Sequence, residues 1–274
     1  MRVWLRSLTS CLGLAGALWL APCTAVHADE LVSIATRPNV KLSFWHMPRP
    51  NAVATVILLT GGAGGLGYKN GQVTSQNFLI RSRDLFAAQG FNVIAPGIPS
   101  DQRELDYDFR ASAEHAEDLQ SVVTWAQQQS AAPVWVIGTS RGTISATNLA
   151  IAQQKQQQKA PSTAPRQGLA GIVLTASVTA YSKAGAVPTQ DLASLRLPVL
   201  VVHHRQDACK ICAPHEVPLI MRGLKNVAVK KLLWIDAGSN PQGDPCEALH
   251  WHGFIGAEAD TVQQIADWVK APSP

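Results

Sequence analysis

A glycine-flanked serine is the residue best placed in this chain to act as a nucleophile. Residues 134–137 form an apolar, β-branched run, and Gly138-Thr139-Ser140-Arg141-Gly142 follows it, before a stretch of small helix-forming residues. A serine hydroxyl attacks only when a base takes its proton and when its oxygen stands clear of its neighbours. The Gly-x-Ser-x-Gly pattern predicts a sharp strand-to-helix turn that lifts the Ser140 hydroxyl above a sheet, and the glycines leave room for that turn.

Two aspartates compete to be the carboxylate that would support this serine. Asp207 comes shortly after an apolar strand predicted over residues 198–203, and Asp236 follows another over residues 227–235. In an open parallel sheet, the loops at the carboxyl ends of the strands face the ligand. We prefer Asp207, because Asp236 lies on the strand that should lead into the histidine-bearing loop. The alternative for Asp207 is an acid in a surface turn.

Four histidines are candidates for the base that accepts the serine proton. His250 and His252 lie just before the last predicted helix, whereas His203 and His204 lie at the end of the strand that precedes Asp207. An imidazole held by a carboxylate on one nitrogen can take a proton on the other and deliver it to a leaving group. We predict His252 as the base, with His250 as its rival. We expect His203 and His204 to close the strand or shape the site.

A glycine-rich loop at residues 60–67 follows the buried strand predicted over residues 52–59. A phosphate-binding loop would need a lysine before Ser/Thr, or a regular glycine spacing leading directly into a helix, and neither is present. The backbone N–H of Gly62 or Ala63 can instead donate to an oxyanion, together with the N–H of Arg141 after the serine. The alternative is a flexible connection with no chemical role.

The elements that must position these residues alternate along the chain. Strands are predicted at 31–36 and 40–46 as a hairpin, and then at 52–59, 91–95, 134–137, 169–175, 198–203 and 227–235. Helices are predicted at 76–89, 111–129, from the serine to about 152, and at 214–224 and 256–270. A loop is predicted at 96–109, and residues 153–167, which are low in complexity, are expected to form a solvated helix end and a surface loop. This alternation predicts an α/β fold: a mainly parallel sheet with helices on both faces.

From residue 52 to residue 271 the chain resembles the α/β-hydrolase family. The resemblance rests on the Gly-x-Ser-x-Gly segment, the glycine loop, and an acid followed by a histidine in chain order. Asp207-Ala208-Cys209, Asp244-Pro245-Cys246-Glu247-Ala248 and His252-Gly253-Phe254 look like a subgroup of small exported bacterial hydrolases. The resemblance implies the α/β-hydrolase fold, with Ser140 as nucleophile, Asp207 as acid and His252 as base. The family's histidine before the glycine loop is Thr60 here.

Three cysteines follow the N-terminal segment: Cys209, Cys212 and Cys246. Cys209 lies two residues after the predicted acid and Cys246 six before the predicted base, so a Cys209–Cys246 disulfide would tether the two loops if acid and base meet. A Cys212–Cys246 pairing stays open. The competing interpretation is a zinc site in which His250 or His252 adds a ligand to the cysteines.

Residues 1–28 have the pattern of a signal peptide. Two arginines precede an apolar stretch at residues 8–21 that is too short to span a membrane comfortably, and small residues suit cleavage after Ala28. Export to the periplasm or beyond is therefore expected. A lipoprotein modified at Cys23 and an uncleaved membrane anchor are the alternatives.

Residues 29–274 have the size of one domain with a single large core. The net charge of +4 falls by two once the two arginines of the leader are removed, and lysine and arginine form no cluster. This weak excess predicts no nucleic-acid partner. No later apolar stretch is long enough to span a membrane.

The sequence as a whole predicts an exported serine hydrolase that cleaves a small ester or thioester through an acyl-Ser140 intermediate, without a cofactor. Residues 176–195 carry too little apolar content for a large lid, which favours short-chain substrates. Tyr68, Tyr107 and Trp251 are candidate pocket walls. The alternatives are a peptidase or amidase, a binding protein that keeps the fold without catalysis, and a metal-dependent hydrolase with Cys and His ligands.

Overall fold

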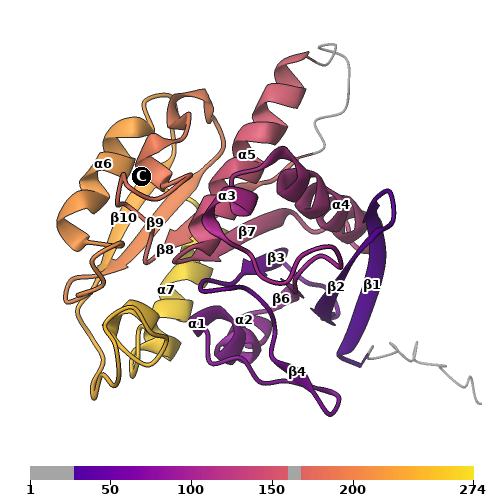
Figure 1. The fold of residues 1–274 in the computed structure, drawn as a ribbon, viewed down its shortest axis with the longest axis horizontal. Helices are drawn as coiled ribbons and strands as arrows, with labels where there is room; N and C mark the ends of the chain where they lie inside the picture. The colour runs from indigo at the N-terminus through magenta and orange to yellow at the C-terminus, as the bar shows by residue number, and fades with distance from the viewer. Residues whose placement is uncertain (1–27, 160–167) are drawn as a thin grey trace, which may run out of the picture.

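The computed structural model describes residues 28–159 and 168–274 (Figure 1). The expected signal peptide therefore lies outside the described residues except for Ala28, and so does most of the loop expected after the serine-bearing helix. Within the described ranges, no helix is both long and apolar enough to cross a membrane.

Eight strands of the described chain form one twisted sheet with the spatial order β1-β2-β6-β3-β7-β8-β9-β10 (Figure 1). The β1–β2 and β2–β6 pairs are antiparallel, and the remaining pairs are parallel, as predicted. The strands are β1 (Glu30–Arg37), β2 (Val40–Met47), β3 (Ala54–Leu59), β6 (Phe91–Pro96), β7 (Val134–Thr139), β8 (Gly171–Thr175), β9 (Val199–His204) and β10 (Lys230–Ile235).

The central strands are buried on both faces, and their sequences explain why. Every residue of β3, β6, β7, β8 and β9 is buried, which matches their continuous aliphatic runs. The edge strands differ: β1 alternates between exposed and half-buried positions, and β10 is mostly half-buried and begins with Lys230 and Lys231. Lysine at an edge strand discourages pairing with another chain.

Helices cover both faces of the sheet and enclose two apolar cores. On one face, α1 (Phe78–Arg81), α2 (Arg83–Ala88) and α7 (Glu258–Lys270) pack around Phe86, Trp135 and Trp268. On the other face, α4 (Ala113–Gln129), α5 (Gly142–Lys159) and α6 (Val217–Gly223) pack around Val136 and Leu149. This arrangement is the two-sided cover expected from the alternation of strands and helices.

Several predicted boundaries are wrong for physical reasons. The helix predicted over residues 76–89 is two short helices, α1 and α2, because the chain bends at Ser82. The loop predicted at 96–109 leads into a helix, α3 (Tyr107–Arg110), which is capped by the Asp106 side chain. The serine-bearing helix α5 ends at Lys159, within the stretch where a solvated helix end was expected, but Gln153 is buried there and its side chain accepts from the Leu169 N–H at 2.9 Å.

Short elements lie in the loops that connect the main ones. A small hairpin, β4 (Tyr68–Lys69) with β5 (Gln72–Val73), projects from the chain after the glycine loop (Figure 1). The 3-10 turns are η1 (Val187–Thr189), η2 (Leu192–Ser194), η3 (Pro214–Glu216) and η4 (Trp251–Gly253). Between β8 and β9 only η1 and η2 form, so no large lid is built there.

Candidate active site

Ser140 sits on a sharp turn between β7 and α5. Its backbone is in the left-handed region at φ 52°, and its N–H donates to Thr175 O of β8 at 3.0 Å. A Cβ on Gly138 would lie 2.4 Å from Gly142 O, and a Cβ on Gly142 would lie 2.1 Å from Leu59 O. Only glycine fits at either position, so the two flanking glycines let the helix, the turn and strand β3 approach closely. The predicted strand–turn–helix around Ser140 is present.

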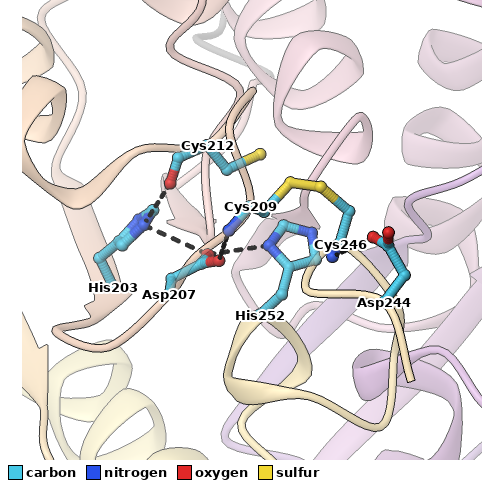
Figure 2. The surroundings of a disulfide bond; sticks show 7 residues. All are labelled: His203, Asp207, Cys209, Cys212, Asp244, Cys246 and His252. Atoms are coloured by element: carbon cyan, nitrogen blue, oxygen red, sulfur yellow. Dashed lines mark hydrogen bonds and ion pairs between the residues drawn. A yellow bond between two sulfur atoms is a disulfide. The ribbon is translucent and has the colours of Figure 1, made fainter. Parts of the chain in front are cut away.

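Asp207, in the loop after β9, and His252, in η4, are joined by a hydrogen bond although 45 residues separate them in the chain (Figure 2). Asp207 Oδ2 lies 2.8 Å from His252 Nδ1, and both side chains are buried. A carboxylate oxygen accepts, so the neutral imidazole carries its proton on Nδ1 and leaves Nε2 as a basic lone pair. This is the tautomer that a general base needs.

The Asp207 carboxylate has two further partners. Its Oδ1 accepts from the Cys209 N–H at 2.9 Å, and its Oδ2 lies 3.4 Å from Nε2 of the buried His203 (Figure 2). Burial alone would raise the pKa of Asp207, but hydrogen bonds from His203 and His252 outweigh it and lower the pKa to about 2. The carboxylate is therefore ionised across the ordinary pH range.

The rival residues are held elsewhere. Asp236 is exposed and pairs with Arg205 at 3.1 Å, and it forms no hydrogen bond to a histidine in the described parts of the chain. His204 stacks on Trp251, with ring centroids 4.8 Å apart, and donates from Nε2 to Ala237 O at 3.0 Å. His250 makes a T-shaped contact with Trp251 and no hydrogen bond to an acid in the described parts of the chain.

His203, expected from the sequence to close the strand or shape the site, contacts both Asp207 and the loop that follows it. Its Nε2 lies 2.9 Å from Cys212 O, and because a carbonyl oxygen only accepts, Nε2 must carry the proton. That same proton faces Asp207. His203 thus ties the acid to the following cysteine loop. The sequence signal was its place at the end of β9, four residues before the acid.

Ser140 and His252 open on one pocket of about 350 Å³. The glycine loop forms one wall, a polar segment at residues 75–77 forms another, and Phe78 and Ile211 supply apolar surface. Nε2 of His252 is buried and has no hydrogen-bond partner among the described residues. The three aromatic residues predicted as walls are absent from this lining: Tyr68, Tyr107 and Trp251.

The predicted oxyanion donors line the same pocket. Arg141, Gly62 and Ala63 all contribute to its surface, and in the described ranges none of their backbone N–H groups has an acceptor within hydrogen-bond distance. The Arg141 guanidinium itself packs over the Tyr107 ring, 4.7 Å from its centroid. The amides of these three residues are therefore available to a bound anion.

The cysteines pair as Cys209–Cys246, with an S–S distance of 2.05 Å, and Cys212 is a free buried thiol (Figure 2). The disulfide joins the loop after Asp207 to the loop before His252. Donor atoms of Cys209, Cys212 and His252 lie within 4.8 Å of one another, which is the only metal-like grouping in the described residues. It fits zinc poorly, because the Cys209 sulfur is already bonded and His252 Nδ1 is held by the acid.

Comparisons with known proteins support the fold. No protein-family model and no curated protein matches the sequence. Among solved structures, the chain is similar to an esterase from Pyrococcus furiosus, at a TM-score of 0.60 and 18% identity over 89% of this chain and 92% of that one. It is also similar to a dienelactone hydrolase from Anabaena variabilis, at a TM-score of 0.59 and 16% identity over 90% of this chain and 99% of that one.

A third similar structure is a serine hydrolase without a lid from Xanthomonas campestris, at a TM-score of 0.53 and 16% identity over 86% of this chain and 94% of that one. At such low identities the likeness concerns architecture. The chain has the α/β-hydrolase fold, as its sequence predicted, and only two 3-10 turns form between β8 and β9.

Proposed function

We propose that this chain is a serine hydrolase that cleaves a carboxylic ester or thioester with Ser140 as nucleophile, His252 as base and Asp207 as acid. The single observation that carries the proposal is the buried Asp207–His252 pair at 2.8 Å: His252 lines the same pocket as Ser140, and its Nε2 has no hydrogen-bond partner among the described residues. The similarity to structures of esterases and hydrolases supports it.

In the acylation step, His252 Nε2 takes the proton of Ser140 Oγ while Oγ bonds to the carbonyl carbon of the substrate. The carbonyl oxygen gains negative charge and accepts from the N–H of Arg141 and that of Gly62 or Ala63. His252 then gives its proton to the departing alcohol or thiol as the bond to the carbonyl carbon breaks. The ionised Asp207 stabilises the transient imidazolium.

In the deacylation step, water repeats the sequence on the acyl enzyme. His252 takes a proton from water, the resulting hydroxyl bonds to the acyl carbon, and Ser140 Oγ leaves with the proton that His252 returns to it. The products are a carboxylic acid and the alcohol or thiol released earlier. Neither reaction step uses a cofactor.

A small substrate is the best match for the pocket. Its volume of about 350 Å³ is near the lower end of the range for ligand sites. The wall at residues 75–77 is Ser-Gln-Asn, which offers hydrogen bonds where a lipid chain would need apolar surface. We therefore propose short acyl groups, with a small molecule as the only partner required.

The test is turnover of p-nitrophenyl acetate, butyrate and octanoate beside a matched p-nitroanilide. The proposal predicts ester turnover that falls with chain length, slower or absent amide turnover, and collapse in His252→Ala but not in His250→Ala. Faster amide cleavage would identify a peptidase or amidase instead. A folded protein that cleaves none of them would identify a binding protein.

We also propose that the protein is exported with residues 1–28 removed. The supporting features are the leader-like sequence and the disulfide, since disulfides persist in oxidising compartments. Amino-terminal sequencing of protein recovered from the periplasm or medium should begin at Asp29. Recovery of the intact amino terminus from membranes would indicate an uncleaved anchor, and a lipid-modified Cys23 a lipoprotein.

A further inference from the structure

A positive charge is buried behind the glycine loop without a carboxylate partner. Arg110, the last residue of α3, is 1% exposed. Among residues 28–159 and 168–274 no carboxylate lies within ion-pair distance of it. Burial, together with the charge of Arg141, lowers the pKa of Arg110 to about 9, so the guanidinium is still charged at neutral pH. Burying an unpaired charge is costly, which calls for a compensating role.

Neutral oxygen atoms surround the Arg110 guanidinium. Nε donates to Leu105 O at 3.0 Å, Nη1 to Ser145 Oγ at 3.1 Å, and Nη2 to Gly62 O at 3.3 Å. The buried His115 lies behind Ser145, with Nε2 2.9 Å from Ser145 Oγ. Burial lowers the pKa of His115 to about 3, so this ring is neutral and adds no second charge.

Three successive carbonyl oxygens of the glycine loop, those of residues 61–63, each accept a hydrogen bond. Gly61 O accepts from the Gly64 N–H at 3.1 Å, Gly62 O from Arg110, and Ala63 O from the Leu105 N–H at 2.7 Å. Leu105 O is in turn held by Arg110. Arg110 and Leu105 therefore clamp the loop through its carbonyls, while the N–H groups of Gly62 and Ala63 have no acceptor among the described residues.

The clamp fixes the direction of one amide. Gly62 C=O and Ala63 N–H belong to one planar trans peptide, so they point in opposite directions. The carbonyl points at Arg110, which does not line the pocket, whereas Gly62 and Ala63 both do. The Ala63 N–H accordingly points away from Arg110 and to the pocket side. A cation on the carbonyl also polarises the peptide and strengthens its N–H as a donor.

We propose that Arg110 is a positioning residue for the oxyanion site: it holds the Gly62–Ala63 peptide so that the Ala63 N–H donates to the developing oxyanion. This inference rests on the serine-hydrolase function proposed above. It also assigns the second donor to Ala63, where the sequence left Gly62 and Ala63 as equals. The positive field of Arg110, transmitted through a single peptide, would act most strongly when the substrate oxygen becomes charged.

The test compares Arg110→Met and Arg110→Lys with Ser145→Ala, which removes a partner of Arg110 that makes no hydrogen bond to the glycine loop in the described parts of the chain. Each variant is checked for folding by circular dichroism and thermal melting. For p-nitrophenyl acetate, kcat and KM are measured separately. The inhibition constant of a small alkylboronic acid is measured as well, because its tetrahedral serine adduct places an oxygen in the oxyanion site.

For Arg110→Met we expect kcat to fall about 10- to 100-fold, with KM within about threefold, because oxyanion contacts form only in the transition state. The boronate inhibition constant should rise in parallel. Arg110→Lys keeps the charge but cannot span both Leu105 O and Gly62 O. Its kcat and its boronate inhibition constant should therefore lie between those of Arg110→Met and those of the unsubstituted protein. Ser145→Ala leaves the bonds of Arg110 to Leu105 O and Gly62 O in place, so its kcat should fall less than that of either Arg110 variant.

The possible results separate this inference from the function on which it rests. A folded Arg110→Met or Arg110→Lys with unchanged kcat and boronate affinity overturns the positioning role while the hydrolase stands. If Arg110→Met does not fold, the Arg110→Lys kinetics decide alone. Equal losses of kcat in Ser145→Ala and Arg110→Lys indicate general packing and also overturn it. An unsubstituted protein without esterase activity overturns both proposals.

Discussion

The two halves of the candidate site are held in place by different physical means. Ser140 is positioned by backbone sterics within one contiguous strand–turn–helix, where a Cβ on Gly142 would lie 2.1 Å from Leu59 O. Asp207 and His252 come from separate loops and are held by side chains: their mutual hydrogen bond, His203, and the Cys209–Cys246 bridge. The serine half is thus built into the regular fold, whereas the acid–base half depends on a few long-range bonds.

This difference teaches where each half should be vulnerable. Larger side chains at the flanking glycines should damage the serine half, because backbone atoms leave no room there for a Cβ. Changes in charge or redox state should damage the acid–base half, because electrostatic and covalent bonds hold it. The following predictions, from the largest expected effect to the smallest, test that contrast.

The largest effect is expected from Asp207→Asn. An amide at this position can stabilise the wrong tautomer of His252 and cannot stabilise its protonated form, so kcat should fall about 10⁴-fold. Asp236→Asn is the matched control, since Asp236 is exposed and pairs only with Arg205 in the described structure; its kcat should stay within about twofold. Ester turnover by the two purified variants checks this, and equal activities would remove Asp207 from the mechanism.

Removing the disulfide should have the next largest effect. The bridge closes a loop of 37 residues, and such bridges typically stabilise by about 2–4 kcal/mol. We expect a reductant to lower both the unfolding free energy in urea and the ester turnover, because the acid and base loops are no longer tied together. In the double variant Cys209→Ser/Cys246→Ser a reductant should change nothing further. Full activity of that variant would show that side-chain contacts alone hold the acid–base half.

A shape change in the serine half should cost about 1–3 kcal/mol of stability, together with activity. In Gly142→Ala the new methyl meets backbone atoms, which cannot move aside as a flexible side chain can. Gly243→Ala, in the loop that leads to His252, meets nothing within 4 Å and should cost only the strain of its φ of 75°. Urea unfolding of both variants measures this difference. If Gly243→Ala is the more damaging, the contrast between the two halves is reversed.

These vulnerabilities parallel what could be predicted from the sequence. The strand–turn–helix around Ser140 was predictable because its cause lies within a few neighbouring residues. Asp207 and His252 were predictable only through chain order and strand-end position, since the contact that joins them spans 45 residues. The disulfide could be narrowed to two pairings, and the structure contains the one between Cys209 and Cys246.

Other features had no readable signal in the sequence. No local pattern marks Arg110 as buried, because its burial depends on α3 and on contacts with Gly62 and Ser145. Gln153, in the glutamine-rich end of α5 whose composition indicated solvent, is buried because its side chain makes a tertiary contact with the Leu169 N–H. Local patterns identify elements; the partners that bury polar groups come from elsewhere in the chain.

The smallest effect, counted per pH unit, concerns the acid response of two buried groups, His115 and Asp207. His115, beneath α5, has its pKa lowered from 6.5 to about 3 by burial, so the unfolded chain binds its proton first and stability falls as pH drops from about 6.5 to 3. Asp207, lowered from 3.8 to about 2, contributes stability above pH 3.8 that is lost as pH falls toward 2.

We therefore expect His115→Gln to flatten the stability curve between pH 6.5 and 3 by up to about 1.4 kcal/mol per pH unit, while the loss that Asp207 contributes below pH 3.8 remains. Urea unfolding at half-unit pH steps measures the slopes. A slope in His115→Gln equal to that of the unsubstituted protein would show that His115 is not the group that titrates.

The central claim is that Ser140 becomes a covalent nucleophile when His252 and Asp207 activate it. Its most direct measurement is fluorophosphonate labelling, read by intact mass and by peptide mapping. We predict one added phosphonyl group on the peptide that carries Ser140, none in Ser140→Ala, and strongly slowed labelling in His252→Ala. A folded protein that stays unlabelled, or a label found on any residue other than Ser140, would contradict the account.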